Sequence, residues 1–331
     1  MDEAALTAGC DEKRSMKERG FDTTTDEVLE GIDLRGKTAL ITGGSSGLGA
    51  ETARALASKG AAVVITARNM AKGEGVAAAI RRNTNNANVF AERLELGSIG
   101  NIRALADRLL VRHPRLDLLI NNAGVMACPY AQTEDGFELQ FGSNHLGHFL
   151  LTNLLMPALG NGAPSRVVVL SSRAHQLAPV DFADPNFTNR PYHKWFAYGQ
   201  AKTANALFAV GLNLRHAEQG VEAFSVHPGM IRTELSRHMD DDDRAFLARR
   251  AGDSGGTLAM KSVEAGAATS VYAATAVELS GRGGAYLEDC KIAEVNDDPG
   301  QAGGVRSYAV DAGDADRLWT LSEELLASRI S

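Results

Sequence analysis

Short apolar runs alternate with longer amphipathic segments along most of this chain. The apolar runs are rich in Val, Ile and Leu, which is typical of buried strands. They predict strands at residues 38–41, 62–67, 89–94, 116–120, 166–170, 221–226 and 284–287. The segments between them predict helices at residues 50–59, 70–82, 99–113, 198–219, 262–277 and 314–329, with another beginning near residue 141. This alternation predicts an α/β fold, a single doubly wound parallel sheet of about seven strands with helices on both faces.

The segment after the first predicted strand is rich in glycine. It reads Thr42-Gly43-Gly44-Ser45-Ser46-Gly47-Leu48-Gly49, and a helical pattern follows it directly. Glycines allow a sharp turn close to a phosphate, and the free N–H groups of a new helix favour negative charge. A glycine-rich hairpin or linker is the alternative, but the strand before the segment and the helix after it favour a Rossmann-type cofactor cradle. We expect cofactor contacts from Gly43, Ser45, Ser46, Gly47, Leu48 and Gly49.

The end of the second predicted strand bears on the choice of cofactor. An acidic residue there would bond the adenosine ribose and repel a 2′-phosphate. This chain has Arg68 instead, and an arginine pairs well with a phosphate. A solvated surface arginine is the alternative interpretation. Because no acid stands at this strand end, the sequence favours NADP(H) over NAD(H).

Candidate chemistry follows the fifth predicted strand. That strand ends in Ser171-Ser172, and after a loop-rich segment come Tyr198 and Lys202, four residues apart on one helix face. Tyrosine has an ordinary pKa near 10, and a neighbouring ammonium favours the phenolate. A tyrosine tuned in this way can exchange a proton with an alcohol or carbonyl while hydride moves to or from a nicotinamide. The Ser172 hydroxyl would hold the substrate oxygen.

These motifs, in this order, resemble the short-chain dehydrogenase/reductase family over about residues 33–330. Asn121-Asn122-Ala123-Gly124 and Asn144 add to the resemblance, and residues 144–149 and 284–291 are similar to its retinol-dehydrogenase-like branch. The resemblance implies that Tyr198 is the acid/base, that Lys202 tunes it and binds the ribose, and that Ser172 orients the substrate. It implies a proton-relay role for Asn144. The family pattern favours Ser172 over Ser171 as the catalytic serine.

The resemblance also implies further cofactor contacts. They follow several predicted strands, at Glu95, Leu96, Asn122, Ala123, Gly124, Pro228, Gly229, Ile231 and Thr233, with Tyr198 and Lys202 in addition. Glu95 departs from the aspartate that the family usually has at the end of the third strand, so its contact with adenine is left open.

Composition limits the possible partners and cellular location of the protein. The chain has 331 residues, is 44% hydrophobic and carries a net charge of −7, which gives no basic footprint for nucleic acid. No apolar run approaches the ~20 residues of a membrane helix, and residues 1–30 lack the apolar core of a secretory signal. Cys10, Cys128 and Cys290 have no paired spacing and read as reduced thiols. We expect a cytoplasmic protein with a small-molecule substrate and no nucleic-acid or membrane partner, as a homodimer or homotetramer.

The expected organisation is an N-terminal arm at residues 1–30 and one domain at residues 31–331. Within the domain, residues 234–262 form the longest irregular stretch and are the expected substrate lid. Asp240 to Asp243 suit a helix N-terminus there. The segment between Arg173 and Ala197 and the lid are expected to line the substrate pocket. The aromatic residues of that segment predict an apolar or aromatic substrate, namely Phe182, Phe187, Tyr192, Trp195 and Phe196.

Other functions remain open at this point. The same fold could serve a nucleotide-sensing protein without turnover, although such a protein needs no acid/base pair. An epimerase or dehydratase uses the same Tyr–Lys pair, but usually with another glycine spacing and an acidic second-strand end. A light-dependent tetrapyrrole reductase shares several motifs. His145 and His148 lie three residues apart without a third ligand at metal spacing, so no metal site is expected.

Overall fold

The computed structural model describes residues 19–235, 239–253 and 259–329. In this part of the chain the strands form one eight-stranded sheet in the order β3-β2-β1-β4-β5-β6-β7-β8. The strands are β1 Thr38–Ile41, β2 Ala62–Ala67, β3 Val89–Arg93, β4 Leu118–Asn121, β5 Ser165–Leu170, β6 Val221–His227, β7 Tyr286–Glu288 and β8 Lys291–Ile292. All neighbours are parallel except β7 and β8. The predicted doubly wound sheet is confirmed, with the short antiparallel β8 added.

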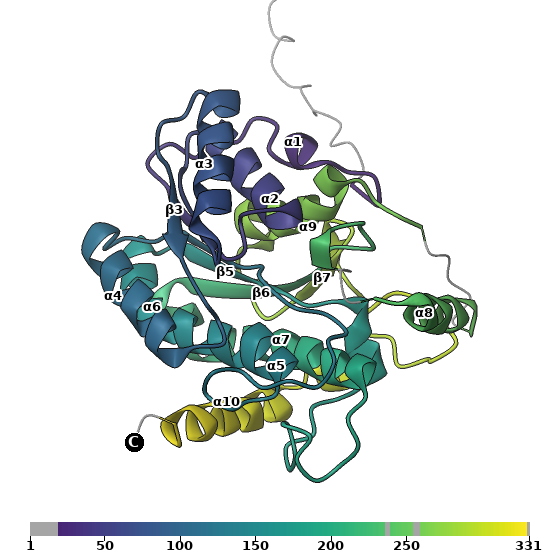
Figure 1. Cartoon of the computed structure of the whole chain (residues 1–331). Helices are drawn as coiled ribbons and strands as arrows, with labels where there is room; N and C mark the ends of the chain where they lie inside the picture. Colours follow the sequence, from purple (N-terminus) through teal and green to yellow (C-terminus); the bar gives the residue numbers. More distant parts are fainter. Residues whose placement is uncertain (1–18, 236–238, 254–258, 330–331) are drawn as a thin grey trace, which may run out of the picture.

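Helices cover both faces of the sheet (Figure 1). One layer holds α1 Thr25–Val28, α2 Gly47–Ser58, α3 Met70–Thr84 and α9 Val263–Thr275. The opposite layer holds α4 Ile99–Arg112, α5 Leu139–Phe141, α6 Gly147–Gly162, α7 Lys194–His216 and α10 Ala312–Ala327. A further helix, α8 Asp241–Asp253, lies to the side of these layers. The strand order reverses between β1 and β4, which is where ligands bind in sheets of this kind.

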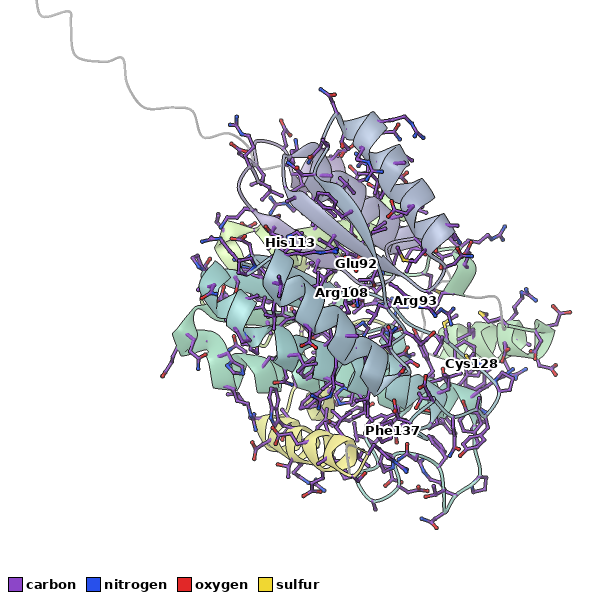
Figure 2. The ribbon with its side chains drawn as sticks, turned by 60° about the vertical axis from the view of Figure 1, so that its left-hand side comes forward. Glu92, Arg93, Arg108, His113, Cys128 and Phe137 are labelled. Carbon is purple, nitrogen blue, oxygen red and sulfur yellow. The ribbon has the colours of Figure 1, made fainter. Side chains whose placement is uncertain are left out.

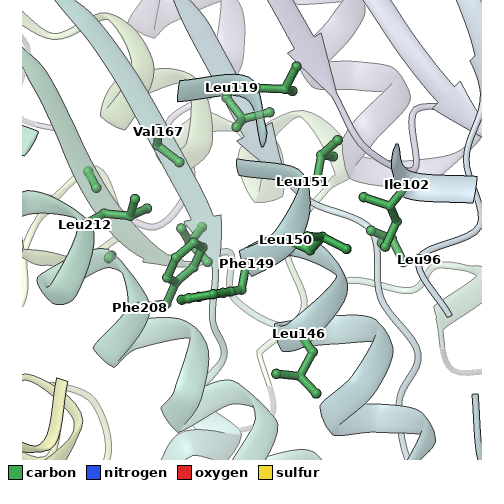
Figure 3. Packing of buried hydrophobic residues seen from close by; sticks show 14 of the residues in the cluster. Leu96, Ile102, Leu119, Leu146, Phe149, Leu150, Leu151, Val167, Phe208 and Leu212 are labelled. Atoms are coloured by element: carbon green, nitrogen blue, oxygen red, sulfur yellow. The ribbon is translucent and has the colours of Figure 1, made fainter. Parts of the chain in front are cut away.

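The core lies between the sheet and the two helical layers. Figure 3 shows the α6–α7 side, where Phe149 and Phe208 meet beneath Val167 of β5. The two rings are 5.3 Å apart between centroids, and both are almost fully buried. Burial of side chains of this size contributes about 1.5–3 kcal/mol each. This packing fixes α6 and α7 beneath the sheet.

Charged side chains lie on β3, the outer strand of the sheet. Glu92 of β3 faces α4, as Figure 2 shows, and accepts hydrogen bonds from Arg108 at 3.2 Å and Arg112 at 2.7 Å. Arg93, the next residue, is exposed. Charged side chains on an edge strand discourage pairing with another sheet.

Some boundaries differ from the sequence prediction. Helix α7 begins at Lys194, so Tyr198 and Lys202 lie one and two turns inside it and not at its start. The last part of the predicted N-terminal arm is folded onto the domain, because α1 packs on α9 and α2 and its Val28 is buried. Residues 1–18 of the arm lie outside the described part. Cys128 and Cys290 are buried free thiols, and Cys10 lies outside the described residues.

Candidate active site

A cavity of about 1300 Å³ opens at the carboxyl ends of the strands. Pockets for one small ligand are usually 300–1,000 Å³, so this one has room for a dinucleotide and a second molecule. The structure brings nearly all predicted contact residues to its wall: Gly43, Ser45, Ser46, Gly47, Leu48, Gly49, Arg68, Glu95, Leu96, Asn122, Ala123, Gly124, Ser172, Tyr198, Lys202, Pro228, Gly229, Ile231 and Thr233. Asn144 is the one predicted site residue that does not line it.

The glycine-rich turn leaves donors free at the start of α2. Gly43 and Gly47 have φ of +67° and +53°, a conformation that favours glycine. Ser46, the N-cap of α2, makes no side-chain cap hydrogen bond, and the first turn carries no acidic residue. The first N–H groups of a helix lack partners inside the helix. They therefore suit an anion such as a pyrophosphate.

Thr42 connects this turn to the next strand and to α6. Its Oγ1 accepts hydrogen bonds from the N–H groups of Asn122 and Ala123, both at 2.9 Å. The same hydroxyl lies 2.8 Å from Nε2 of His148, whose Nδ1 lies 2.9 Å from the carbonyl oxygen of Asn144. A carbonyl only accepts, so His148 carries its proton on Nδ1, and its Nε2 accepts from Thr42. Burial lowers the pKa of His148 to about 4, which keeps the ring neutral as this network requires.

Asn144 lies behind the cavity wall in a local π-helical segment, Gly142–Leu146. Its Oδ1 accepts from the N–H of Val125 at 2.8 Å, and its Nδ2 donates to the carbonyl of Val125 at 2.9 Å. Both ends of the amide are therefore bonded to the backbone of Val125, in the loop after β4. Single π-turns often mark functional positions in helices.

The two serines at the end of β5 face different partners. Ser171 is buried, and its Oγ donates to the carbonyl of Lys202 at 2.8 Å. Ser172 lines the cavity, and its Oγ accepts from the N–H of Ala174 at 3.1 Å. The Lys202 ammonium donates to the carbonyl of Leu170 at 2.8 Å and lies 5.6 Å from the centre of the Tyr198 ring. Strand β5 and helix α7 thus present Ser172, Tyr198 and Lys202 at one wall.

Burial dominates the ionisation of this group. It raises the pKa of Tyr198 above its usual range, and a hydrogen bond with Ser172 opposes the rise. It lowers the pKa of Lys202 from 10.5 to about 7. Loss of water disfavours the charged form of both side chains. In the protein alone, the tyrosine is a neutral phenol at neutral pH.

Charged residues stand at the rim of the cavity. Arg68 is exposed, and its guanidinium makes no hydrogen bond or ion pair with the residues that the structure describes. Lys72, one turn along, donates to both carboxylate oxygens of Glu234 at 2.7 Å. Glu95 bends back toward its own loop, where its Oε1 accepts from the N–H of Gly97 at 3.3 Å. Lys72 does not line the cavity, whereas Glu234 does.

Several apolar side chains line the cavity. Its lining includes Met126, Leu177, Trp195, Met239 and Leu247. Cys128, labelled in Figure 2, lines it too.

The prediction that five aromatic residues line this pocket is wrong for four of them. Phe182, Phe187, Tyr192 and Phe196 are absent from the lining, and only Trp195 belongs to it. Phe187 is buried beneath the guanidinium of Arg190, and the hydroxyl of Tyr192 donates to the carbonyl of Cys128 at 2.9 Å. Phe187 and Tyr192 pack on each other within the loop, Phe182 packs against the main core, and Phe196 is exposed on α7. Residue type alone does not distinguish these positions from the lining of a pocket.

Trp195 is held by the helix that covers it. Its Nε1 donates to Oδ1 of Asp243 at 2.8 Å, and Lys194 donates to Oδ2 of the same carboxylate at 2.7 Å. Its ring stacks on Phe246 of α8. Helix α8 begins at Asp241, in agreement with the predicted helix start in the aspartate run. Residues 236–238 and 254–258 of the predicted lid lie outside the described part.

Comparison with known proteins decides the family. The short chain dehydrogenase family profile matches residues 37–244. The chain belongs to the short-chain dehydrogenase/reductase family. It is 43% identical to mouse (Mus musculus) retinol dehydrogenase 12 over 295 residues, which are 89% of this chain and 88% of that protein. The retinol-dehydrogenase-like branch is thereby confirmed, and with it an oxidoreductase that acts on alcohol or carbonyl groups.

Solved structures of the family share the fold. A protein from Mycobacterium paratuberculosis has a TM-score of 0.67 and 35% identity, covering 89% of this chain and 95% of its own. Pseudomonas aeruginosa RhlG, solved as an active-site complex with NADP, has a TM-score of 0.60 and 26% identity, covering 77% and 95%. In the described part of this family member, no helix has the length and apolarity to cross a bilayer. No cluster of three His, Cys, Asp or Glu side chains there could hold a metal ion.

The Thr42–His148 network generates a stability prediction. His148→Phe keeps the ring but leaves the Thr42 hydroxyl and the Asn144 carbonyl without partners, so unfolding free energy should fall by about 2 kcal/mol or more. Urea denaturation of His148→Phe, Thr42→Val and the double variant should give a coupling energy of about 0.5–3 kcal/mol. His193→Phe, at an exposed position, is the matched control and should stay within about 0.5 kcal/mol of wild type. Additive effects at Thr42 and His148 would contradict the network.

Proposed function

We propose that the protein is an NADP-dependent oxidoreductase that interconverts a carbonyl and an alcohol on a lipophilic or aromatic small molecule. The observation that carries the proposal is the convergence of Ser172, Tyr198 and Lys202 on a cavity that also contains the glycine-rich turn. A protein that only senses a nucleotide would have no use for the buried tyrosine–lysine pair. Retinol dehydrogenase 12, the relative described above, has a name that fits the same substrate class.

The residues present fit a dinucleotide phosphate. The uncapped start of α2 would hold the pyrophosphate, and Gly47 lets the backbone approach it. Arg68 would pair with a 2′-phosphate, since no acid stands at the end of β2 to repel it. The NADP complex of Pseudomonas aeruginosa RhlG is consistent with this choice.

The chain's own residues handle the oxygen and its proton. A bound nicotinamide supplies or takes up the hydride. Ser172 would hold the substrate oxygen by a hydrogen bond, while the hydroxyl of Tyr198 gives a proton to that oxygen in reduction or takes one in oxidation. Lys202, anchored to Leu170, would favour the phenolate whenever it carries charge.

Burial of Tyr198 favours one direction at neutral pH. Because its pKa lies above the usual range, the phenol is protonated and ready to act as an acid. Carbonyl reduction should therefore hold its rate through neutral pH. Alcohol oxidation needs the phenolate, so its rate should rise with pH.

Helix α8 is proposed as the substrate lid. It carries Leu247 to the cavity wall and is fastened to the first turn of α7 through Asp243. The proposed lid is thus bonded to α7, the helix that carries Tyr198.

Tyr198→Phe tests the chemistry. It removes the exchangeable proton and keeps the ring packing, so kcat should fall ~10²-fold or more with little change in thermal stability. Turnover is measured as NADPH oxidation with a panel of aromatic and aliphatic carbonyl compounds. Tyr130→Phe, at an exposed tyrosine outside the cavity, is the control and should keep wild-type rates.

The serines supply a second comparison in the same assay. Ser172→Ala should reduce turnover far more than NADPH affinity, because its hydroxyl faces the cavity. Ser171→Ala should mainly reduce stability, by about 1 kcal/mol, through the lost bond to Lys202. Near-normal rates in Tyr198→Phe, or the reverse ranking of the serines, would overturn the assignment.

Arg68→Asp tests the cofactor. An arginine–phosphate contact is worth about 1.5–3 kcal/mol, so wild type should prefer NADPH to NADH by at least roughly tenfold in kcat/KM. The variant should lose or reverse the preference, and salt should narrow the wild-type gap because Arg68 is exposed. Arg82→Asp makes the same charge change at the other end of α3 and should leave the preference intact. Equal use of both cofactors by wild type would show that Arg68 is a surface residue only.

A further inference from the structure

Arg173 follows Ser172 directly and lines the same cavity. Its backbone is fixed on both sides. Its own N–H donates to Nδ1 of His227 at 3.2 Å, and the next N–H, from Ala174, donates to Ser172. The Cα atoms of Ser172 and Arg173 are about 3.8 Å apart, as in any trans peptide. The arginine therefore begins next to the position proposed for the substrate oxygen.

The guanidinium of Arg173 has no partner among the described residues. Its Nε is buried and makes no hydrogen bond, and no carboxylate in the described part lies within ion-pair distance. Other partly buried arginines are paired. Arg54 bonds Glu51 and Asp26, and Arg166 bonds two backbone carbonyls. A buried donor left unbonded costs about 1–3 kcal/mol, so an unpaired arginine at a cavity wall indicates a site for an external acceptor.

No side chain in the described part pairs with Arg173 directly. Glu288, opposite His227 in the sheet, accepts a hydrogen bond from the N–H of Gly304 instead. His175 and His227 are its near neighbours, and burial holds the pKa of each well below its usual value, so both are neutral. The adjacent cation Lys261 is already paired with Asp289. The unpaired guanidinium can therefore attract an anion.

Apolar side chains line the cavity near the same loop, among them Leu177 and Trp195. A purely lipophilic substrate would bury the guanidinium against carbon and leave its donors unsatisfied. A carboxylate accepts two parallel N–H bonds from a guanidinium and would satisfy it.

We propose that Arg173 selects substrates that carry a carboxylate close to the reacting carbonyl or alcohol, on an otherwise apolar body. The inference rests on the proposed function for the location of the reacting group. Because Arg173 adjoins Ser172, the carboxylate and the carbonyl lie within the span of about one aromatic ring. The substrate class is thus an oxo acid or hydroxy acid with an aromatic or aliphatic frame. Arg173 is in this sense a specificity-determining residue.

The test compares charged and neutral forms of one compound. The 2-, 3- and 4-carboxybenzaldehydes and their methyl esters are reduced with NADPH by wild type, Arg173→Met and Arg173→Lys. For at least one isomer, wild type should prefer the acid to its ester by roughly tenfold or more in kcat/KM, in line with a charge-assisted bidentate contact. Arg173→Met should abolish the preference without lowering ester turnover, and Arg173→Lys should retain part of it. Arg244→Met is the control, since Arg244 lines the cavity but is paired with Asp241, and it should keep the preference.

A binding measurement separates this inference from the proposed function. Isophthalate is titrated by calorimetry into wild type and Arg173→Met, each saturated with NADP. Arg173-dependent binding of isophthalate without aldehyde turnover would support the carboxylate site and overturn the proposed function. Equal kcat/KM for acids and esters in wild type, together with equal isophthalate binding by the two proteins, would overturn the carboxylate site. Weaker NADPH binding in Arg173→Met with an unchanged acid-to-ester ratio would also overturn it, by assigning the residue to the cofactor.

Discussion

The clamp between the end of β5 and helix α7 is the interaction on which the site depends. The carbonyl of Leu170 accepts from the ammonium of Lys202 at 2.8 Å and from Nδ2 of Asn205 at 2.9 Å. Ser171 returns a hydrogen bond to the carbonyl of Lys202. These bonds are buried, so they fix the helix against the strand both in distance and in rotation. Ser172 and Tyr198 reach one wall of the cavity because the residues beside them are held in this way.

The burial of Lys202 in this clamp lowers the stability of the folded protein. Lys202 has a pKa of about 7 in the folded protein and 10.5 as a free side chain, so the unfolded chain binds this proton more tightly. Between those values stability rises with pH, by at most about 1.4 kcal/mol per unit, and below pH 7 the full destabilisation remains. An apolar side chain such as methionine or leucine at position 202 would avoid this loss of stability. A lysine beside a buried tyrosine is understandable if the pair transfers a proton during the reaction. Shifted pKa values of this kind are common at functional sites.

Much of this architecture could be predicted from sequence because it depends on local pattern. Apolar runs predicted the approximate positions along the chain of the seven parallel strands. The turn from Gly43 to Gly49 could be placed by the strand before it and the helix after it. The strand β8 was missed, because two residues carry no periodic signal. The start of α7 was placed four residues late, since Lys194 to Ala197 look like the end of a loop when the bonds from Lys194 and Trp195 to Asp243 are unknown.

Contacts between distant segments set the limit of prediction. The pairing of Thr42 with His148, the anchoring of Asn144 on Val125 and the unpaired guanidinium of Arg173 all depend on tertiary neighbours. Aromatic residues before Tyr198 were assigned to the pocket by type, whereas only Trp195 among them lines it. Residue type indicates what a side chain can do, and only the fold determines what it meets.

The most direct measurement is the ionisation of Lys202. Protein labelled with ¹³C at the ε-carbon of lysine is titrated by NMR, and the Lys202 resonance is identified by its loss in Lys202→Met. A buried lysine clamped to Leu170 should titrate near pH 7, while exposed lysines titrate near 10.4. Titration of Lys202 together with the exposed lysines would contradict the account, because the ammonium would then be in water and not beside Tyr198.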